Sequence, residues 1–174
     1  KLYRKYSPGP ISYILKLKKD SLISKNVTNK KNTLAVRFPS HPITRNLLKK
    51  LNYPLAAPSA NISTKISPVS KKDVQDEFGK KISLILDGGP SKIGVESTII
   101  NLINKPQILR LGGIPKEEIK KYLKLDLRLN SRSKIKSPGQ EKIHYSPYIK
   151  LRLNVKNVNK NEAFVLIKKR KKIC

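Results

Sequence analysis

The sequence contains neither methionine nor tryptophan, and it has only one cysteine, Cys174. A single cysteine excludes a disulfide framework or a cysteine-based metal site within one copy of the chain. No apolar run approaches the roughly 18 residues that a membrane-spanning helix needs, and no signal-peptide pattern opens the chain. We therefore expect a cytoplasmic protein without a membrane partner. Because methionine is absent even at position 1, we expect a fragment or a processed product.

Acidic residues are also scarce, with 11 Asp and Glu against 39 Lys and Arg, which gives a net charge of +28. Such an excess is typical of nucleic-acid-binding proteins. However, 31 of the basic residues are lysines, they are spread along the whole chain, and Asn and Ile are abundant too. An A/T-rich coding sequence produces the same composition, so both interpretations stay open.

Hydrophobic residues make up 37% of the chain, and their spacing alternates between two periods. A period of two predicts strands at residues 11–18, 33–38, 53–57, 82–86, 97–103 and 107–111. Helical spacing predicts helices from Pro42 to Leu51, from Ser67 or Ser70 to Gly79 with Ser70 and Asp73 in a capping box, and from Pro115 to Leu123. This order predicts an α/β fold: a three-layer domain with a twisted mixed β-sheet flanked by helices.

The periodicity disappears between residues 126 and 148, where Ser, Pro, Lys and Gly predominate. We therefore predict an α/β domain over residues 1–125, a linker over 126–148, and the beginning of a truncated second domain over 149–174. Residues 163–167 read as a strand of that second domain.

Arg37 lies in the otherwise apolar strand predicted at residues 33–38. A buried guanidinium without a partner is costly, so Arg37 is expected to meet an anion. The alternative is an arginine at the end of a strand that reaches solvent. Thr33 shares the face of Arg37 at a distance of about 13 Å along the strand, which suits a ligand with two polar ends.

Small polar residues gather in two further segments. Ser59, Asn61, Ser63 and Ser67 lie in a loop that runs into a helix, where hydroxyls and free amides can hold phosphates. Ser67 could equally be only a helix cap. The segment Gly94–Thr98 fits a plain turn into a strand, and Arg110 stands beside two glycines and repeats the pattern of Arg37.

Several kinds of catalytic centre are not indicated. His41 and His144 lack Cys, Asp or Glu neighbours at metal-ligand spacing, so we expect no metal site made of protein ligands alone. The sequence shows no Ser-His-Asp arrangement and no phosphate-binding loop of the Gly-x-x-x-x-Gly-Lys type.

Taken in order, these segments resemble the YrdC-type family, specifically the threonylcarbamoyl-AMP synthases that serve tRNA modification. The matching segments are Ser7–Pro10, Thr33–Pro39, His41–Pro42, Ala57–Ser63, Ser67–Pro68, Leu86–Gly89, Gly94–Ile99 and Ile108–Gly112. Two more, Ser137–Gly139 and His144–Pro147, resemble the linker of the longer, two-domain members. The matching segments cover most of residues 7–123.

The resemblance implies that L-threonine, bicarbonate or CO₂, and ATP give threonylcarbamoyl-AMP and pyrophosphate, mostly by positioning and charge stabilisation. It also implies residue roles. The expected L-threonine contacts are Arg37, Ala57 and Ser97; the expected ATP contacts are Thr33, Ser59, Asn61, Ser67, Arg110 and Tyr145, the last as part of a lid. Mg²⁺ would be held mainly by phosphates and water. Expected partners are the threonylcarbamoyl-transferase proteins that use the product, with tRNA as a candidate.

The chain departs from the family pattern in several places. Ser12, Thr64, Val69 and Gln140 each replace a usual residue. More important, family members carry an earlier Pro-Thr-Glu-Thr-like segment and a Lys-x-Arg motif that binds the triphosphate, and neither occurs here. We therefore expect the sheet to be incomplete at its N-terminal side, and the isolated chain to be inactive and marginally folded.

Two other functions remain to be weighed. One is a YrdC-like RNA-binding module without catalysis, for which salt-dependent tRNA binding would be diagnostic. The other is the YrdC-like domain of a carbamoyl-transfer enzyme for hydrogenase maturation. The linker segment with His144 and Tyr145 argues against the latter.

Overall fold

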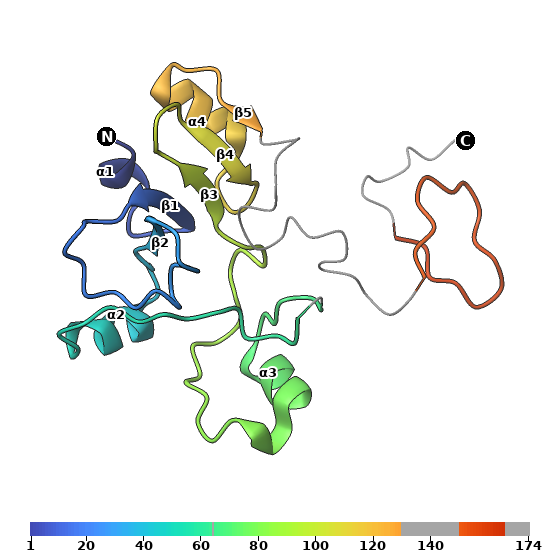
Figure 1. Ribbon diagram of the computed structural model, residues 1–174. Coiled ribbons are helices and arrows are strands. Elements are labelled where there is room, and N and C mark those ends of the chain that lie inside the picture. The colour runs from blue at the N-terminus through green and yellow to red at the C-terminus, as the bar shows by residue number, and fades with distance from the viewer. Residues whose placement is uncertain (64, 130–149, 166–174) are drawn as a thin grey trace.

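A five-stranded mixed sheet forms the centre of the computed structural model, which describes residues 1–63, 65–129 and 150–165 (Figure 1). The strands are β1 (Ile11–Lys16), β2 (Thr33–Arg37), β3 (Thr98–Asn101), β4 (Gln107–Arg110) and β5 (Arg128–Leu129), in the order β2-β1-β3-β4-β5. The pairs β1–β3 and β4–β5 are parallel, whereas β1–β2 and β3–β4 are antiparallel. The predicted α/β fold with a mixed sheet flanked by helices is confirmed.

The hydrophobic core lies on the face of the sheet that carries Ile11 and Tyr13. Helices α1 (Leu2–Tyr6) and α4 (Lys116–Leu123) contribute to it from two distant parts of the chain. Ile119 of α4 is fully buried, as are Ile100 and Ile108 of the strands. The rings of Tyr6 and Tyr122 meet edge to face at 5.7 Å, which joins the two helices.

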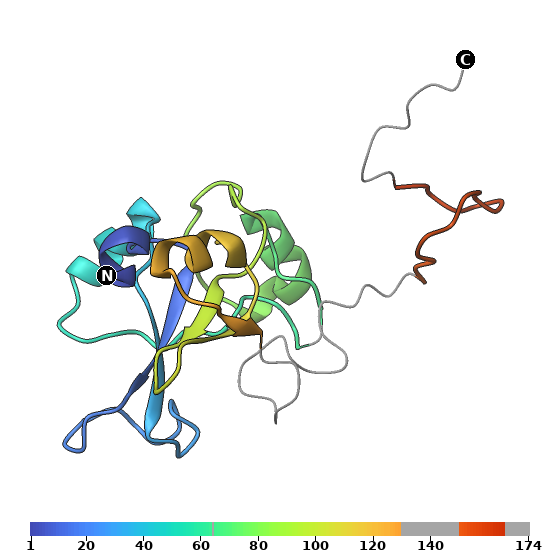
Figure 2. The ribbon, with the colours of Figure 1, turned by 90° about the horizontal axis from the view of Figure 1, so that it is seen from above.

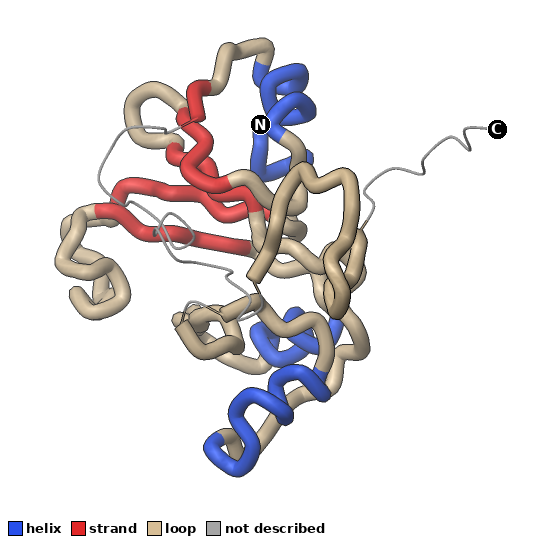
Figure 3. Tube along the Cα trace, turned by 90° about the vertical axis from the view of Figure 1, so that its right-hand side faces the viewer, coloured by secondary structure: helices blue, strands red, loops and turns tan. Residues whose placement is uncertain are grey.

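Two further helices, α2 (Pro42–Lys49) and α3 (Lys71–Phe78), come from the middle of the chain, and a 3₁₀ turn η1 (Gly79–Lys81) follows α3. Figure 3 shows two groups of helices, one beside the strands near the N-terminus and one below them. Neither α2 nor α3 contains a buried residue. Their positions along the chain agree with the sequence, but they do not share in the core.

Two predicted strands, at residues 53–57 and 82–86, are wrong: neither segment pairs with the sheet. Leu84 is 74% exposed and Leu86 is 55% exposed, so no layer covers the apolar side that suggested a strand. Apolar residues do recur in these two segments. A strand also needs a hydrogen-bonded neighbour, and none of the described segments provides one.

Two elements were not predicted, namely the short helix α1 and the strand β5. Leu127 is buried and β5 follows it, so the sheet continues into residues that the sequence indicated only as linker. The described part of the expected second domain, residues 150–165, contains no strand and lies away from the sheet (Figures 1 and 2). The predicted division into domains stays a prediction.

Among the described residues, none of the helices is long and apolar enough to cross a bilayer.

Candidate anion-binding site on the sheet

Four strands place one residue each in a row across the sheet. Arg37 of β2 lies opposite Ser12 of β1, Ser12 lies opposite Ile99 of β3, and Ile99 lies opposite Arg110 of β4. Directly paired residues of neighbouring strands point to the same face, and this face is the one opposite the core. We call Arg37, Ser12, Ser97 and Arg110 the arginine row, because Ser97 joins Ser12 to Arg110.

The middle of the arginine row is a hydrogen-bonded network. The Oγ atoms of Ser12 and Ser97 lie 2.8 Å apart, and both residues are buried. Arg110 donates from Nε and Nη2 to the carbonyl oxygen of Ser97 at 3.1 and 3.0 Å, and from Nη2 to Ser97 Oγ at 3.2 Å. These bonds fix the plane of the Arg110 guanidinium beside the start of β3.

Gly112 allows this close approach of β4 and β3. A Cβ atom at position 112 would lie 2.3 Å from the carbonyl oxygen of Glu96 and 2.5 Å from backbone atoms of Ser97 and Thr98. The next residue, Gly113, donates its backbone N–H to the same Glu96 oxygen at 2.8 Å. Any side chain at 112 would therefore push the start of β3, and with it Ser97, out of place.

Glu96 connects the arginine row to the loop before α3. Its Oε1 accepts a hydrogen bond from Ser67 Oγ at 2.5 Å, and its Oε2 lies 3.5 Å from Arg110 Nη2. Ser67 is therefore not the cap of α3. That cap is Ser70, which forms the predicted capping box with Asp73. The hydroxyl of Ser67 is directed to the site instead.

The guanidinium of Arg37 lies at the other end of the arginine row. Its Nε donates to the carbonyl oxygen of Gly9 at 3.3 Å, and Gly9 in turn donates its backbone N–H to Phe38 at 2.8 Å. Surrounding protein removes water from Arg37 and lowers its pKa; the charge of Glu96 opposes this shift and that of Arg110 adds to it. Among the described residues, no carboxylate forms an ion pair with Arg37.

The expectation of a buried Arg37 needs correction, because the residue as a whole is exposed. The physical reason is its position: β2 is the outermost strand of the sheet, so one side of Arg37 is open. An arginine that is accessible, partly desolvated and not neutralised can still receive an anion from solvent.

Thr33 lies at the opposite end of β2, paired with Lys16. Four residues of strand separate it from Arg37 on the same face, which is about 13 Å. The structure therefore keeps the expected geometry of two polar positions along one strand.

Three further predicted residues that the structure describes are not joined to the arginine row. Ala57 and Ser59 are exposed, and no hydrogen bond links either to it among the described residues. Asn61 holds its own loop together, since its Nδ2 donates to the carbonyls of Ile62 and Lys65, both at 3.0 Å. Tyr145 lies outside the described residues.

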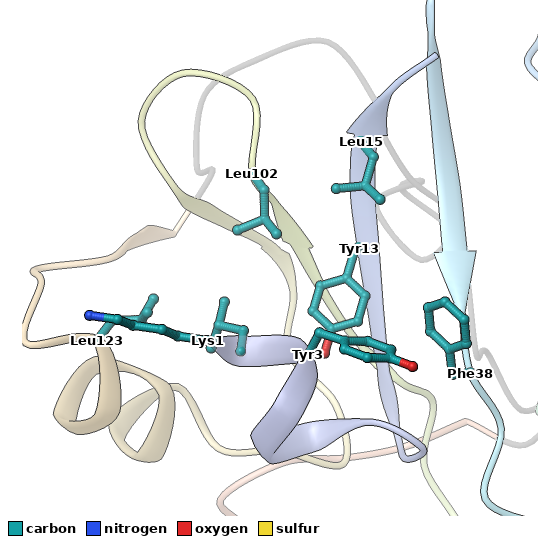
Figure 4. Close-up of a pocket in the computed structure, with 8 residues that line it drawn as sticks. Lys1, Tyr3, Tyr13, Leu15, Phe38, Leu102 and Leu123 are labelled. Atoms are coloured by element: carbon teal, nitrogen blue, oxygen red, sulfur yellow. The ribbon is translucent and has the colours of Figure 1, made fainter. Parts of the chain in front are cut away.

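A pocket of the described chain lies away from the arginine row (Figure 4). It has a volume of about 530 Å³ and opens between α1, β1 and the end of β2, with Tyr3, Tyr13, Leu15 and Phe38 in its wall. Tyr13 and Leu15 belong to the face of β1 opposite Ser12, and none of the residues lining the pocket is a predicted site residue. Its wall is mostly apolar, with Lys1 as the charged residue among those that line it, and it contains no residue of the arginine row.

Sequence analysis did not single out two members of this network, Ser12 and Glu96. A signal existed for Ser12, because it is a lone small polar residue inside an apolar strand. It lies two residues after Pro10, as Arg37 lies two residues before Pro39. For Glu96 the signal was its rarity: it is one of 11 acidic residues in the chain, placed directly before a strand.

Fold and site together define an α/β protein with a cationic, hydroxyl-lined row at one face of a mixed sheet. The chain belongs to the Sua5/YciO/YrdC family, whose sequence profile, described as telomere recombination, matches residues 1–112. A second profile, described as the C-terminal domain of threonylcarbamoyl-AMP synthase, matches residues 114–174. These matches confirm the family that the motifs indicated.

Individual relatives support the same family assignment. A threonylcarbamoyl-AMP synthase of Pyrococcus abyssi is 40% identical over 153 residues, which is 84% of this chain and 44% of that protein. One of Schizosaccharomyces pombe is 39% identical over 181 residues, covering 97% of this chain and 44% of the relative. The crystal structure of P. abyssi Sua5 complexed with L-threonine matches with a TM-score of 0.76 at 39% identity, over 84% of this chain and 44% of that one. The chain thus spans less than half the length of these relatives.

Proposed function

We propose that the protein to which this chain belongs is a threonylcarbamoyl-AMP synthase, a nucleotidyltransferase that joins L-threonine, bicarbonate or CO₂, and ATP. In this proposal the arginine row receives the carboxylate of L-threonine at Arg37, with Ser97 and Ala57 as further contacts. The names of the relatives support the activity, and the complex of P. abyssi Sua5 supports L-threonine as a ligand.

One observation supports the carboxylate site above all others. Arg37 has no carboxylate partner among the described residues, although the chain carries the Glu96 carboxylate close enough to influence it. Glu96 is held by Ser67 and Arg110 instead. A charge-assisted hydrogen bond from Arg37 to an incoming carboxylate would satisfy a group that the fold leaves without a counter-ion.

The nucleotide part of the proposal rests on weaker contacts. Thr33, Ser59, Asn61, Ser67, Arg110 and Tyr145 are proposed to contact ATP, by analogy with the family. Asn61 offers one physical argument, since its Oδ1 is buried and accepts no hydrogen bond from the described residues. A buried acceptor of this kind is available to a donor on a ligand.

Mg²⁺ is proposed to accompany ATP, held mainly by phosphates and water. In the described ranges no three His, Cys, Asp or Glu side chains gather to hold a metal ion, and Glu96 is already engaged. This donor set fits a metal that arrives with the nucleotide rather than one bound by protein ligands. A cytoplasmic location, tRNA contact and delivery of the product to a threonylcarbamoyl-transferase belong to the same proposal.

Binding of L-threonine tests the carboxylate site without requiring turnover. We expect L-threonine to give a saturable signal in calorimetric titration of the 174-residue chain. Replacing Arg37 by Ala should weaken this binding by about ten- to a hundredfold, since a hydrogen bond to a charged group contributes about 1.5–3 kcal/mol.

Arg45→Ala is the matched control, because Arg45 is an exposed arginine on α2, away from the arginine row. It should bind L-threonine like the unmodified chain. Equal binding by the Arg37→Ala and Arg45→Ala variants would contradict the assigned role of Arg37.

A further inference from the structure

We propose that Glu96 is a positioning residue that sets which anions the arginine row accepts. By neutralising Arg110, it reserves Arg37 for a group with a single negative charge, such as a carboxylate, and disfavours multiply charged phosphates at that position. The identity of the natural ligand rests on the proposed function, but the charge selectivity does not.

The contacts of Glu96 give it this role. Its two carboxylate oxygens have different partners, Ser67 Oγ at 2.5 Å and Arg110 Nη2 at 3.5 Å. The side chains of Arg110 and Glu96 are 13% and 25% exposed, so water screens this pair only in part. Ser67 holds the carboxylate of Glu96, and the hydrogen bond from the Gly113 amide to the Glu96 carbonyl oxygen fixes the backbone from which this side chain extends.

The charges of the network explain the selectivity. Two arginines and one glutamate leave one net positive charge, and this charge is centred on Arg37, which forms no ion pair with any described residue. Ser12 and Ser97, with Oγ atoms 2.8 Å apart, link the two ends of the row, and Arg110 donates to Ser97 Oγ at 3.2 Å. In agreement with this arrangement, the charge of Glu96 raises the pKa of Arg37 and that of Arg110 lowers it. A monoanion neutralises this site, whereas each further negative charge meets the carboxylate of Glu96.

Replacing Glu96 by Gln separates this electrostatic role from a structural one. The glutamine oxygen can still accept from Ser67, but the row then carries two net positive charges. We expect the affinity for pyrophosphate to rise about tenfold and the affinity for acetate to change less than about threefold. Both anions are titrated separately, with chemical shifts of the Ser97 and Arg37 amides as the readout.

A control isolates the effect. Glu117→Gln removes the same charge from an exposed position on α4. It should leave the pyrophosphate-to-acetate ratio unchanged. An unchanged ratio in Glu96→Gln, or an equal change in Glu117→Gln, overturns the proposal.

If the Glu96→Gln variant does not fold, Arg110→Gln takes its place. It changes the net charge of the arginine row by removing a positive charge instead of a negative one. Here the net charge of the row falls to zero, and pyrophosphate affinity should drop more than acetate affinity; equal losses would contradict the proposal. L-threonine is titrated in parallel. If the acetate and pyrophosphate results hold while L-threonine does not bind, the proposed function fails and the role of Glu96 stands.

Discussion

Two regions of this molecule differ sharply in how they bury their apolar residues. The sheet region, residues 1–37 and 97–129, contains every described buried residue, with Ile11, Ile100, Ile108 and Ile119 at 0% exposure. The connecting region, residues 38–96, contains none among its described residues, although it includes two helices. Regular secondary structure is therefore not a measure of packing in this chain, because local propensity and capping can form a helix that buries nothing.

This difference divides the candidate site. Ser12, Arg37 and Arg110 lie on strands backed by the core, and Ser97 directly precedes β3, so their positions are fixed by the packing on the other face. Ala57, Ser59 and Asn61 lie in the connecting region, where only local hydrogen bonds hold them. The hydrogen bond from Ser67 to Glu96 joins the two regions at the site. We infer that the part of the site on and beside the strands is preorganised, and that the part in the connecting region is not.

The largest expected effect separates the two regions by stability. Ile100→Ala removes a fully buried side chain and should lower the free energy of unfolding by about 2–5 kcal/mol. Leu84→Ala, at 74% exposure, should change it by less than about 0.5 kcal/mol. Urea unfolding of both variants measures the difference, and equal losses would mean that the connecting region has a core of its own.

A second substitution probes the junction of β3 and β4. Gly112→Ala places a methyl group against backbone atoms that cannot move aside, so we expect a loss of about 1–3 kcal/mol and shifted amide resonances at Ser97 and Thr98. Gly79→Ala is the control, because its φ of +53° strains the backbone while no atom lies within 4 Å. Unchanged Ser97 resonances in Gly112→Ala would show that the close approach does not position the row.

A smaller effect is expected at the cap of α3. Ser70→Ala removes the side chain that accepts from the Asp73 amide and should destabilise this helix by about 1 kcal/mol. Because α3 buries no residue, the strands should keep their amide chemical shifts. Ser83→Ala, at an exposed position without a side-chain hydrogen bond, is the matched control. Loss of strand signals in Ser70→Ala would show that α3 supports the sheet.

Acid should act on the same helix. Hydrogen bonds from the backbone of Val69, the side chain of Ser70 and the backbone of Ser70 lower the pKa of Asp73 below its ordinary value of 3.8. A lowered pKa in the folded state stabilises α3 fully above pH 3.8, and this contribution is lost as the pH falls below that value. Following the Asp73 carboxyl carbon by NMR measures the shift. In Ser70→Ala the pKa should move back toward 3.8, and a titration curve unaffected by that substitution would contradict the capping box.

The sequence predicted the elements that local patterns determine. The spacing of Ile11 and Tyr13, the Pro42 start of α2 and the capping box of Ser70 and Asp73 all correspond to observed elements. Segments 53–57 and 82–86 were predicted wrongly because pairing depends on a neighbouring strand that their own residues do not specify. Helix α1 was missed because five residues provide barely one helical turn of pattern.

The site could be predicted only in part for a similar reason. Arg37, Ser97 and Arg110 were found because each is a polar residue in an apolar strand or beside a glycine turn. Their partners, Ser12 and Glu96, depend on strand register: Ser12 faces Arg37 only because β1 pairs antiparallel with β2 in this alignment. One sequence does not specify register between two strands that are separated by the loop of residues 17–32. The role of Ser67 was likewise open until Ser70 was seen to cap the helix.

Amide hydrogen exchange on the 174-residue chain tests the comparison most directly. The account predicts slow exchange at the paired amides of β1, β3 and β4, including Thr98 and Leu102, which donate to Pro10 and Ile14. It predicts fast exchange throughout residues 42–95, including the amides of α2 and α3. Equal protection in the two regions, or protection confined to the connecting region, would contradict the claim that the arginine row stands on the only packed part of the described chain.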